Sequence, residues 1–453
     1  MASTKLSRLP STTGNRRTFT ISAWVKRSSL GARQAIFAAG DTGTVGAGGG
    51  SLRFESDDKL RIVFGGGNDG TINSSRVFRD TSAWYHIVWR IDTTQATASD
   101  RAKLWVNGEE ETLSFSTNIS QNYDTAFNYA STNQYTHFGA ARDAGSQGDA
   151  NTHYLDGLMA HIHLTDGQAY SASDFGETDT TTNIWKPKTA PSVTYGTNGV
   201  FLKMENSGAF GTDSSGNGNT FTVNGTMTQT IDTPSNVFAT MNPLQYSPST
   251  EFSNGNLTLR QNAGVNAHRR FLSTLGVSQG KYYWETKCVD NPSTFMNGIS
   301  DGSGGATSYA NFIGELLNDV GYYGDGNVYK NGSSVASGLT TFSAGDIINI
   351  ALDLDNNYIY FGVNGTWINS GVPTSGSSGT GGFSVNSGNT YFAGVSMFTN
   401  NQNSNANFGN GYFGTTAVSS AQNPDDGIGI FEYDVPANYR ALCTKSINAE
   451  EYS

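Results

Sequence analysis

The sequence predicts an all-β protein made of two antiparallel β-sandwich domains, and three observations lead to this fold class. Apolar residues recur at every second position in several short runs, which is the period of a strand that buries one face. Turn-rich stretches separate these runs, in keeping with 55 Gly among 453 residues. No stretch of a dozen residues sustains the spacing of an amphipathic helix. An α/β scheme is therefore disfavoured.

Changes in composition divide the chain into four segments. Residues 1–190 and 249–410 carry the alternating runs, and each is long enough for a sandwich with its own core. Residues 191–248 are rich in Gly, Asn and Thr and should form an ordered connector, because scattered apolar residues give the segment something to bury. Residues 411–453 are expected to form a C-terminal tail with a short helix after Pro436.

Two runs define the strands of the first sandwich. In TFTISAWVKR (18–27) and WYHIVWRID (84–92), apolar side chains alternate with their neighbours over the whole run. Trp24, Trp89 and Trp284 sit within such runs, so they are interpreted as core or sheet-face residues. The first segment is therefore expected to contain long, well-formed strands.

The stretch GDIINIALDLDNNYIYFGVNGTW (345–367) poses a choice between an acid pair with a function and a plain hairpin. Apolar side chains at the even positions 348–354 share one strand face, and Asp353 and Asp355 fall on the other. The two Asn at 356–357 tolerate left-handed turn conformations, after which a second alternating run begins. We interpret the stretch as a hairpin whose carboxylates lie on a solvated face and at a turn entry.

Composition restricts the partners. The chain has 27 Lys and Arg against 38 Asp and Glu, a net charge of −11, and only 14% of its residues are charged. This argues against nucleic-acid binding as the main task. No apolar run approaches the ~18 residues of a membrane span, so no membrane insertion is predicted. The N-terminus shows no apolar secretory segment, and Cys288 and Cys443 fall in different segments, which disfavours a disulfide framework.

One loop has a partial metal-binding pattern. In DSSGNGN, Asp213, Ser215 and Asn217 occupy alternate positions and Gly218 follows, as in the first half of an oxygen-ligand calcium loop. The twelfth position is Asn224 in place of a bidentate Glu, and no helices flank the loop. A Gly/Asn turn is therefore preferred, calcium at these three residues stays open as the alternative, and no other cofactor is predicted.

Motifs in both sandwiches resemble known families. TFTISAWVKR, WYHIVWRID, AKLWVNGEE and LDGLMAHIHLTDGQAYSASDFGE, in this order, resemble concanavalin A-like domains of the laminin G and pentraxin type. The form they are most similar to is the one found in tailed bacteriophages of marine bacteria and cyanobacteria, together with the connector DSSGNGNTFTVNG. The second sandwich resembles the SPRY (B30.2-like) family through GVSQGKYYWE, the hairpin at 345–367 and the closing FAGVSMF and NANFG.

The resemblance implies a non-enzymatic structural protein of a phage virion, assembled in the host cytoplasm. It is expected in the tail fibre or adsorption apparatus, binding neighbouring virion proteins or host-surface glycans, and as a homo-oligomer, with a trimer favoured. Aromatic and acidic residues beside predicted loops of the SPRY-like segment are the candidate ligand-binding residues: Tyr322, Tyr323, Asp325 and Trp367. Alternatives are a capsid decoration or head-fibre protein, a polysaccharide depolymerase and a soluble lectin.

An enzyme is disfavoured by the acids present. Sandwich glycosidases need two carboxylates across a cleft, and the Glu-x-Asp-x-x-Glu pattern that often supplies them in this fold is absent. The acids of GEEE (108–111) directly follow a turn and are interpreted as solvated. His161 and His163 would share a strand face and could pair on a metal, but without a third ligand hydrogen-bonded histidines are the preferred interpretation.

Overall fold

The structure, a computed structural model, divides into two units that each carry their own sheets. The residues it describes are 4–40, 49–65, 69–131, 134–141, 152–244, 250–262, 264, 266–303 and 310–451. The N-terminal unit comprises Met1–Gln229 and Thr233–Ser235, and the C-terminal unit comprises Thr230–Asp232 and Asn236–Ser453. Both consist mostly of antiparallel strands, so the predicted all-β fold class is confirmed.

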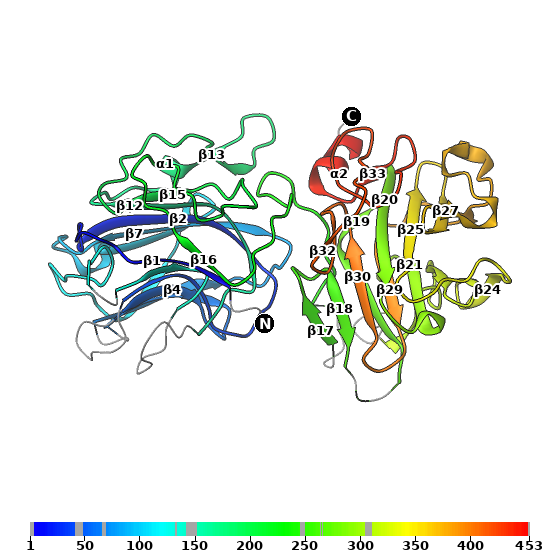
Figure 1. Ribbon diagram of the computed structural model, residues 1–453, viewed down its shortest axis with the longest axis horizontal. Coiled ribbons are helices and arrows are strands. Elements are labelled where there is room, and N and C mark those ends of the chain that lie inside the picture. Colours follow the sequence, from blue (N-terminus) through cyan, green and yellow to red (C-terminus); the bar gives the residue numbers. More distant parts are fainter. Residues whose placement is uncertain are drawn as a thin grey trace. The chain divides into compact units, whose positions relative to one another are not determined.

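Two sheets form the N-terminal unit (Figure 1). In the described residues, one sheet has eight strands in the order β10-β6-β5-β4-β3-β11-β1-β16 and the other six in the order β15-β12-β2-β7-β8-β9, while β13 and β14 pair separately. The elements are β1 (Lys5–Arg8), β2 (Thr18–Arg27), β3 (Gln34–Ala39), β4 (Gly50–Phe54), β5 (Lys59–Phe64), β6 (Gly70–Val77), β7 (Trp84–Asp92), β8 (Ala102–Val106), β9 (Glu109–Glu110), β10 (Leu113–Thr117), β11 (Thr136–Phe138), β12 (Gly157–Asp166), α1 (Ala172–Phe175), β13 (Gly176–Thr178), β14 (Trp185–Pro187), β15 (Val200–Leu202) and β16 (Thr222–Asn224).

The core of this unit lies between the two sheets. The alternating residues of β2 and β7 belong to it, except Tyr85, which is half-buried and packs against it, and rings from both sheets meet there. The Phe127 ring lies 5.0 Å from Phe19 and 5.4 Å from Trp89, centroid to centroid, in tilted and edge-to-face arrangements. Such aromatic pairs add to the free energy gained from burying their area. Trp24 instead lies on the outer face of its sheet, stacked on His86.

The segment predicted as a connector, residues 191–248, is divided between the two units. Strand β15 pairs with β12, and β16 pairs with β1, so residues as far as Gln229 belong to the N-terminal sandwich. Val200 and Phe221 supply the physical reason, because both side chains are buried in the N-terminal core. Residues from Asn236 onward join the C-terminal unit, where Phe238 forms a bridge to Cys443.

The C-terminal unit is also a two-sheet sandwich. In the described residues, its nine-stranded sheet runs β17-β18-β30-β20-β25-β26-β27, with β28 on β26 and β33 on β20, and its six-stranded sheet runs β19-β29-β21-β22-β23-β24. The elements are β17 (Thr250–Ser253), β18 (Thr258–Gln261), β19 (Arg269–Val277), β20 (Lys281–Cys288), β21 (Phe295–Ser300), β22 (Val320–Tyr323), β23 (Val328–Lys330), β24 (Ser333–Ala336), β25 (Ile347–Asp353), β26 (Tyr358–Val363), β27 (Thr366–Trp367), β28 (Phe383–Ser384), β29 (Tyr391–Met397), β30 (Asn403–Asn407), β31 (Tyr412–Phe413), β32 (Thr416–Ala417), β33 (Arg440–Ala441) and α2 (Thr444–Glu451).

The hairpin predicted at 345–367 is confirmed as β25 and β26. The strands pair from Ile348 opposite Val363 to Asp353 opposite Tyr358, and Asn357 takes a left-handed φ of 62° in the turn. The even positions 348–354 all lie in the core between the sheets, as the alternation predicts.

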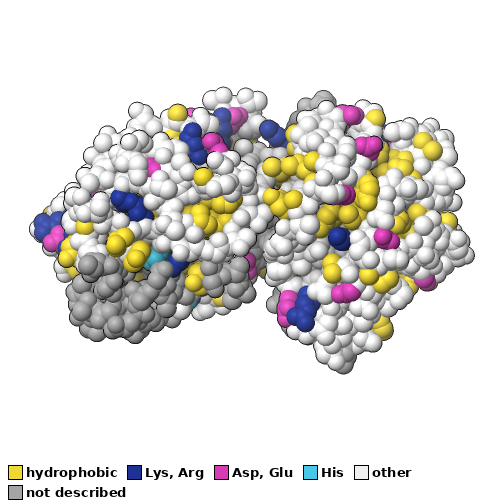
Figure 2. All heavy atoms as spheres, viewed as in Figure 1, with side chains coloured by type: hydrophobic (Ala, Val, Ile, Leu, Met, Phe, Trp, Pro, Cys, Tyr) yellow, Lys and Arg dark blue, Asp and Glu magenta, His cyan; other side chains and the backbone are white. Residues whose placement is uncertain are grey.

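The other face of this hairpin is not solvated, which corrects the sequence-based interpretation. Residues 428–443, here called the C-terminal cover, lie on it, and their Phe431 and Tyr439 pack with Tyr283, Ala351 and Tyr360 in a second apolar cluster. Figure 2 shows apolar side chains on this side of the unit, where β20 and β25 appear in Figure 1. The predicted tail is therefore a layer of the fold, held by parallel pairing of β33 with β20, and its helix is α2.

Glycines shape the outer face of the six-stranded sheet. Gly298, Gly321 and Gly394 lie on three of its strands, where glycine normally weakens a strand. A Cβ at Gly321 would overlap the backbone oxygen of Ile313, and one at Gly394 would press on the Ile313 side chain. Ile313 is fully buried in this space, and its N–H donates to Ser396 Oγ at 2.6 Å. Gly321 and Gly394 thus allow the chain near Ile313 to lie directly on the sheet.

We predict that Gly321→Ala destabilises the C-terminal unit by roughly 1–3 kcal/mol, because the new methyl group displaces the backbone at Ile313. Urea denaturation read by hydrogen exchange on peptides of β22 would measure the loss. Gly208→Ala, in the N-terminal unit, is the control for adding a methyl group where the nearest atom would be 3.4 Å away, and it should change the stability of its own unit little and leave exchange in β22 unchanged. Equal stability of both variants would contradict the packing argument.

Candidate functional site

The calcium candidates lie in a loop closed by its own hydrogen bonds. Asp213 Oδ1 accepts from the backbone N–H groups of Phe201 at 3.0 Å and Ser215 at 2.8 Å, while Oδ2 accepts from Ser215 Oγ and the N–H of Asn219. The Asn217 amide donates to the carbonyls of Gly196 and Gly199. Every lone pair of the carboxylate therefore has an N–H or O–H donor, and the loop takes the form of the Gly/Asn turn that the sequence favoured.

A guanidinium supplies positive charge beside this loop. Arg8 donates to the side-chain oxygens of Asn198 and Asn219, and the Asp213 charge partly offsets the lowering of the Arg8 pKa that burial causes. In the part of the chain that the structure describes, no group of three or more His, Cys, Asp or Glu could hold a metal ion. The positive charge beside the Asp213 loop is thus the Arg8 guanidinium, a group of the chain itself.

The two histidines of β12 are placed differently from one another. A bulge separates Ala160 from His163, and His161 within it has a left-handed φ of 46°. The His163 ring stacks on Phe201 at 4.1 Å between centroids, and its Nδ1 lies 3.0 Å from the Tyr195 hydroxyl. Burial lowers the pKa of His163 well below its ordinary value, so the ring is neutral at pH 7.

A third histidine, His86 on β7, holds the outer layer of the six-stranded sheet. Residues 168–199, here called the strap, cross that face and include α1 and β13 (Figure 1). Trp185 of the strap donates its indole N–H to His86 Nδ1 at 2.9 Å, and His86 Nε2 lies 2.8 Å from Ser22 Oγ. An indole only donates, so Nδ1 carries no proton and the proton sits on Nε2. The His86 ring is fully buried and fixed as this neutral tautomer.

Asp353 and Asp355 each stabilise the turn that they border. Asp353 is fully buried, lies 3.0 Å from Lys281 Nζ and accepts from the backbone and side-chain N–H groups of Asn356. Asp355 Oδ1 accepts from the N–H of Gly280 at 2.9 Å. Both carboxylates therefore serve the hairpin and its turns, and the interpretation of 345–367 as a hairpin is preferred to that of a functional acid pair.

Glu285 on β20 is an acid of the C-terminal unit with a strongly raised pKa. Its carboxylate accepts from the Tyr283 hydroxyl, the Asn407 amide and the backbone N–H groups of Glu432 and Tyr433, at 2.9–3.1 Å. Burial raises the pKa of Glu285 to about 7, against the lowering effect of these donors. A carboxyl group that titrates near neutrality is typical of a general acid. Glu285 is however fully buried beneath the C-terminal cover, which it fastens to the sheet.

The candidate ligand-binding residues do not form one site. Tyr322 is fully buried in the core and its hydroxyl donates to the carbonyl of Thr340, which corrects its selection as a ligand-binding residue. Tyr323, on the opposite face of β22, is half-buried, as expected for adjacent strand positions. Asp325 is exposed and its carboxylate accepts from Asn327 in a turn. Trp367 packs against the cluster under the C-terminal cover, with its ring 6.4 Å from Tyr283.

Tyr323 belongs to a larger aromatic surface. Five half-buried rings follow one another on the C-terminal unit, and this aromatic row consists of Tyr323, Tyr329, Phe312, His268 and Phe398. Successive ring centroids are 6.3, 5.5, 5.1 and 4.8 Å apart. Burial lowers the pKa of His268, so this ring is an uncharged aromatic at pH 7. The row lacks a local sequence signal, because its members come from four separate segments, and only Tyr323 and Tyr329 lie close together in the sequence.

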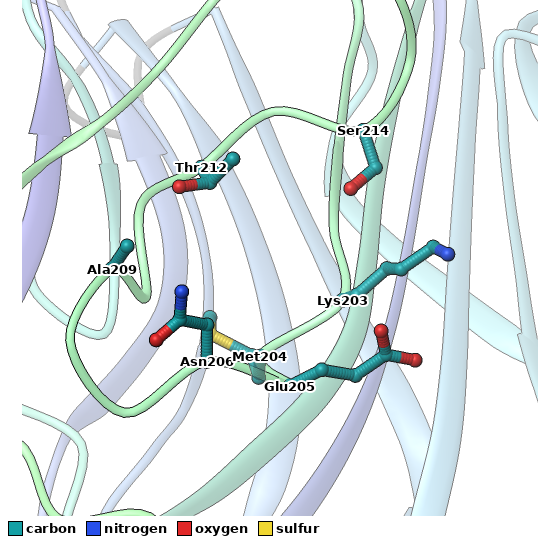
Figure 3. A pocket seen from close by; sticks show the side chains of 7 residues that line it. All are labelled: Lys203, Met204, Glu205, Asn206, Ala209, Thr212 and Ser214. Atoms are coloured by element: carbon teal, nitrogen blue, oxygen red, sulfur yellow. The ribbon is translucent and has the colours of Figure 1, made fainter.

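The N-terminal unit has a small polar pocket beside the end of β15 (Figure 3). Its volume is about 110 Å³, and its lining residues are Lys203, Met204, Glu205, Asn206, Ala209, Thr212 and Ser214. Figure 3 shows Lys203 and Glu205 extending to the same side. Pockets that enclose a drug-sized ligand usually exceed ~300 Å³, so this pocket has room for a single substituent only.

The acids of GEEE form ion pairs. Glu110 lies 2.9 Å from Lys103 Nζ, and both Glu109 and Glu111 pair with Arg76. Glu111 is buried, so the interpretation of the whole stretch as solvated is wrong at that residue.

Among the described residues, no helix has the length and apolar character needed to cross a membrane.

Family comparisons agree with the two sandwiches. Residues 3–167 match a laminin G model described as the concanavalin A-like lectin/glucanases superfamily, and residues 281–411 match the SPRY domain model. The chain carries a concanavalin A-like domain and a SPRY domain. No curated protein matches the chain.

Solved structures similar to this chain include several SPRY domains. The SPRY domain of human HERC1 is 20% identical, with 37% of this chain and 96% of that chain covered and a TM-score of 0.29. A human SPRY domain is 18% identical, with 36% and 95% covered and a TM-score of 0.25. The PSpry domain of TRIM65 is 13% identical, with 37% and 88% covered and a TM-score of 0.29.

We predict that acid weakens the concanavalin A-like domain through His86. Burial lowers the folded-state pKa of His86 to about 3 from an ordinary 6.5, so its stabilising effect is complete above pH 6.5 and is lost as the pH falls. The free energy of unfolding should therefore be about 2 kcal/mol lower near pH 5 than above pH 6.5 with respect to this group. Urea denaturation near pH 5 and pH 8, read by hydrogen exchange on peptides of β7 and β14, measures it. His86→Gln should show a flatter pH profile, and an unchanged profile would refute the assignment.

We predict that the stability of the SPRY domain depends on pH in the opposite direction, and that it falls as the pH rises, through Glu285. The pKa of Glu285 is about 7 when folded and 4.5 ordinarily, so folding takes up a proton between these values. The free energy of unfolding is therefore highest below pH 4.5 with respect to this group and falls by up to about 3 kcal/mol as the pH rises through 7. Exchange on peptides of β20 and the C-terminal cover reports the change. Glu285→Gln should be less stable overall and lack this decline; a decline of equal size in the variant would contradict the prediction.

Proposed function

We propose that this chain is a non-enzymatic structural and recognition protein of a tailed-phage virion, acting in the tail fibre or adsorption apparatus and contacting host-surface glycans. The virion assignment is supported by the ordered motifs that resemble phage concanavalin A-like domains, followed by the connector and the SPRY-like motifs. Its partners would be neighbouring virion proteins and its own copies. Two domains of families that host many kinds of ligand are consistent with recognition.

The observation that carries the recognition part is the aromatic row of the SPRY domain. Tyr323 and Tyr329 point away from the core, because Tyr322 and Val328 beside them point into it. Half-buried rings offer apolar faces to a ligand at little cost in side-chain entropy, and Tyr adds a hydroxyl group for hydrogen bonding. Sugars combine an apolar ring face with hydroxyl groups, so a row of such rings suits an oligosaccharide.

Recognition is favoured over hydrolysis by the state of the acids. Burial raises the pKa of Glu285 to about 7 and that of Asp319 to about 6, and both carboxyl groups are fully buried, so a substrate cannot reach either of them. A glycosidase instead places its acid and its second carboxylate on either side of a cleft. A depolymerase would therefore have to use other residues.

We predict that Tyr323→Ala and Phe312→Ala each weaken glycan binding roughly three- to ten-fold, the effect of losing one aromatic contact. A glycan array with the purified chain would find the ligand, and calorimetry with that glycan would measure the affinities. Tyr412→Ala is the control, because Tyr412 is also a half-buried tyrosine of this unit but lies outside the row. Equal binding by all three variants would exclude the row as the binding surface.

Immunogold electron microscopy of intact virions tests the location. Label on the tail fibres, with a trimeric mass in solution, is the expected result. Label over the head would replace the tail assignment with capsid decoration. Absence of label from the particles would refute the virion proposal and return the soluble lectin and the depolymerase as the leading functions.

A further inference from the structure

Three arginines of the concanavalin A-like domain converge on one glutamate. Arg53 lies in β4 and Arg61 in β5, directly opposite each other in the strand register. Their neighbours Leu52 and Ile62 point into the core, so the two guanidinium groups are on the outer face of the eight-stranded sheet. Arg33 approaches from the residue before β3.

Glu55 fixes the three side chains. Its Oε1 lies 2.6 Å from Arg53 Nε and 3.3 Å from Arg61 Nη1, and its Oε2 lies 2.8 Å from Arg33 Nε. The Glu55 side chain is only 4% exposed. Burial by itself would raise the pKa of Glu55, but the arginines lower it below its ordinary value on balance, so the carboxylate is charged. The cluster is thus a rigid arrangement around an anion.

The cluster keeps an excess of positive charge. Three guanidinium groups share one carboxylate, and in the described residues no second acid lies within ion-pair distance of any of them. Their other partners are neutral, because Arg61 Nε donates to Asn73 Oδ1 and Arg53 Nη1 to Ser51 Oγ. Like charges directly opposite in a sheet destabilise it. Counted over the described residues, two of the three positive charges are therefore not balanced by an acid, in a chain whose net charge is −11.

The guanidinium groups also reach the surface. The side chains of Arg33 and Arg61 are 46% and 29% exposed, and none of the nitrogens of the three arginines is both buried and unpaired. Arg33 and Arg53 use Nε on Glu55, which leaves N–H groups at their Nη atoms. A planar fork of such groups fits the paired oxygens of a sulfate or carboxylate.

A second ion-pair cluster on the same hairpin shows what a structural pair looks like here. Asp58 pairs with Arg27 and Arg79, and the Arg27 guanidinium is 0% exposed, lies over the Phe54 ring and donates to the carbonyl of Phe78. The Arg27 guanidinium therefore makes its contacts inside the domain and is not accessible to a ligand. Arg33 and Arg61 differ, because each retains an exposed edge.

We propose that Arg33, Arg53 and Arg61, held by Glu55, form a binding site for the anionic groups of an acidic polysaccharide, either sulfate esters or uronate carboxylates. Neutral polar groups continue from the cluster across β6 and β10, where Asn73 Nδ2 donates to Ser116 Oγ, and they can serve the hydroxyl groups of the same chain. The inference rests on the proposed function in taking a glycan as the ligand, but it concerns a different domain and a different chemistry from the aromatic row.

The test measures binding of the full chain to dextran sulfate, to polygalacturonate and to uncharged dextran. We expect binding to one or both polyanions, weakening as salt is raised, and none to dextran. Arg33→Gln and Arg61→Gln should each reduce the polyanion affinity about ten-fold. Both variants leave Glu55 with two arginines, and a thermal unfolding midpoint equal to that of the unmodified chain shows that folding is retained. Arg17→Gln is the control, since Arg17 is 42% exposed but pairs one-to-one with Asp124.

Each outcome decides the proposal. Sulfate-only or uronate-only binding that is lost in the Arg33 and Arg61 variants supports it and identifies the anionic group. No polyanion binding, or equal losses in the Arg17 control, overturns it. Duplex DNA bound as tightly as dextran sulfate would overturn the glycan as ligand and make the cluster a general polyanion site. The aromatic-row and virion-labelling experiments are unaffected by these results, so failure here is distinct from failure of the proposed function.

Discussion

The architecture depends on one constraint, which is that the sheets of this protein carry apolar side chains on their outer faces as well as toward the cores. A two-layer sandwich buries only the inner faces. Val88 and Trp105 in one domain, and Ala351 and Tyr360 in the other, are buried on the outer side. Such surfaces need a further layer, because exposing them would forfeit the free energy of their burial.

The layer of each domain comes from its own chain, the strap from the connection between β12 and β15 and the C-terminal cover from residues that follow β32. The strap covers the concanavalin A-like domain and the C-terminal cover lies on the SPRY domain. In both cases a buried ionisable group joins the layer to the sheet, a neutral His86 in the first and Glu285 in the second. Polar contacts of this kind fix the register of the layer, whereas apolar packing alone leaves its position less specific.

The strands and their core-facing residues could be predicted from the sequence, whereas the layers that cover the outer faces of the sheets could not. Alternation located β2, β7 and the β25–β26 hairpin, since a period of two is a local property. Asp353 looked solvated by the same logic, because nothing near it in sequence reveals that residues 428–443 return to that face. A short polar run likewise gave no sign that Asp213 would be saturated by four donors.

The candidate site illustrates the same limit. Tyr323 could be selected beside a predicted loop, but Tyr322 was selected with it and lies buried in the core. Phe312, His268 and Phe398 join it only through the tertiary fold, and the Arg33, Arg53 and Arg61 cluster forms only once three strands are in register. Sites assembled from distant segments need the fold before they can be recognised.

The parallel pairing of β33 with β20 has a consequence for synthesis. During translation β20 and β25 emerge long before the residues that cover them, so the outer face of the nascent SPRY sheet stays open until residues 428–443 leave the ribosome. Contacts of such high sequence separation form slowly. The concanavalin A-like domain has all its strands by β16, and it can complete its fold while the second domain is still waiting for its last layer.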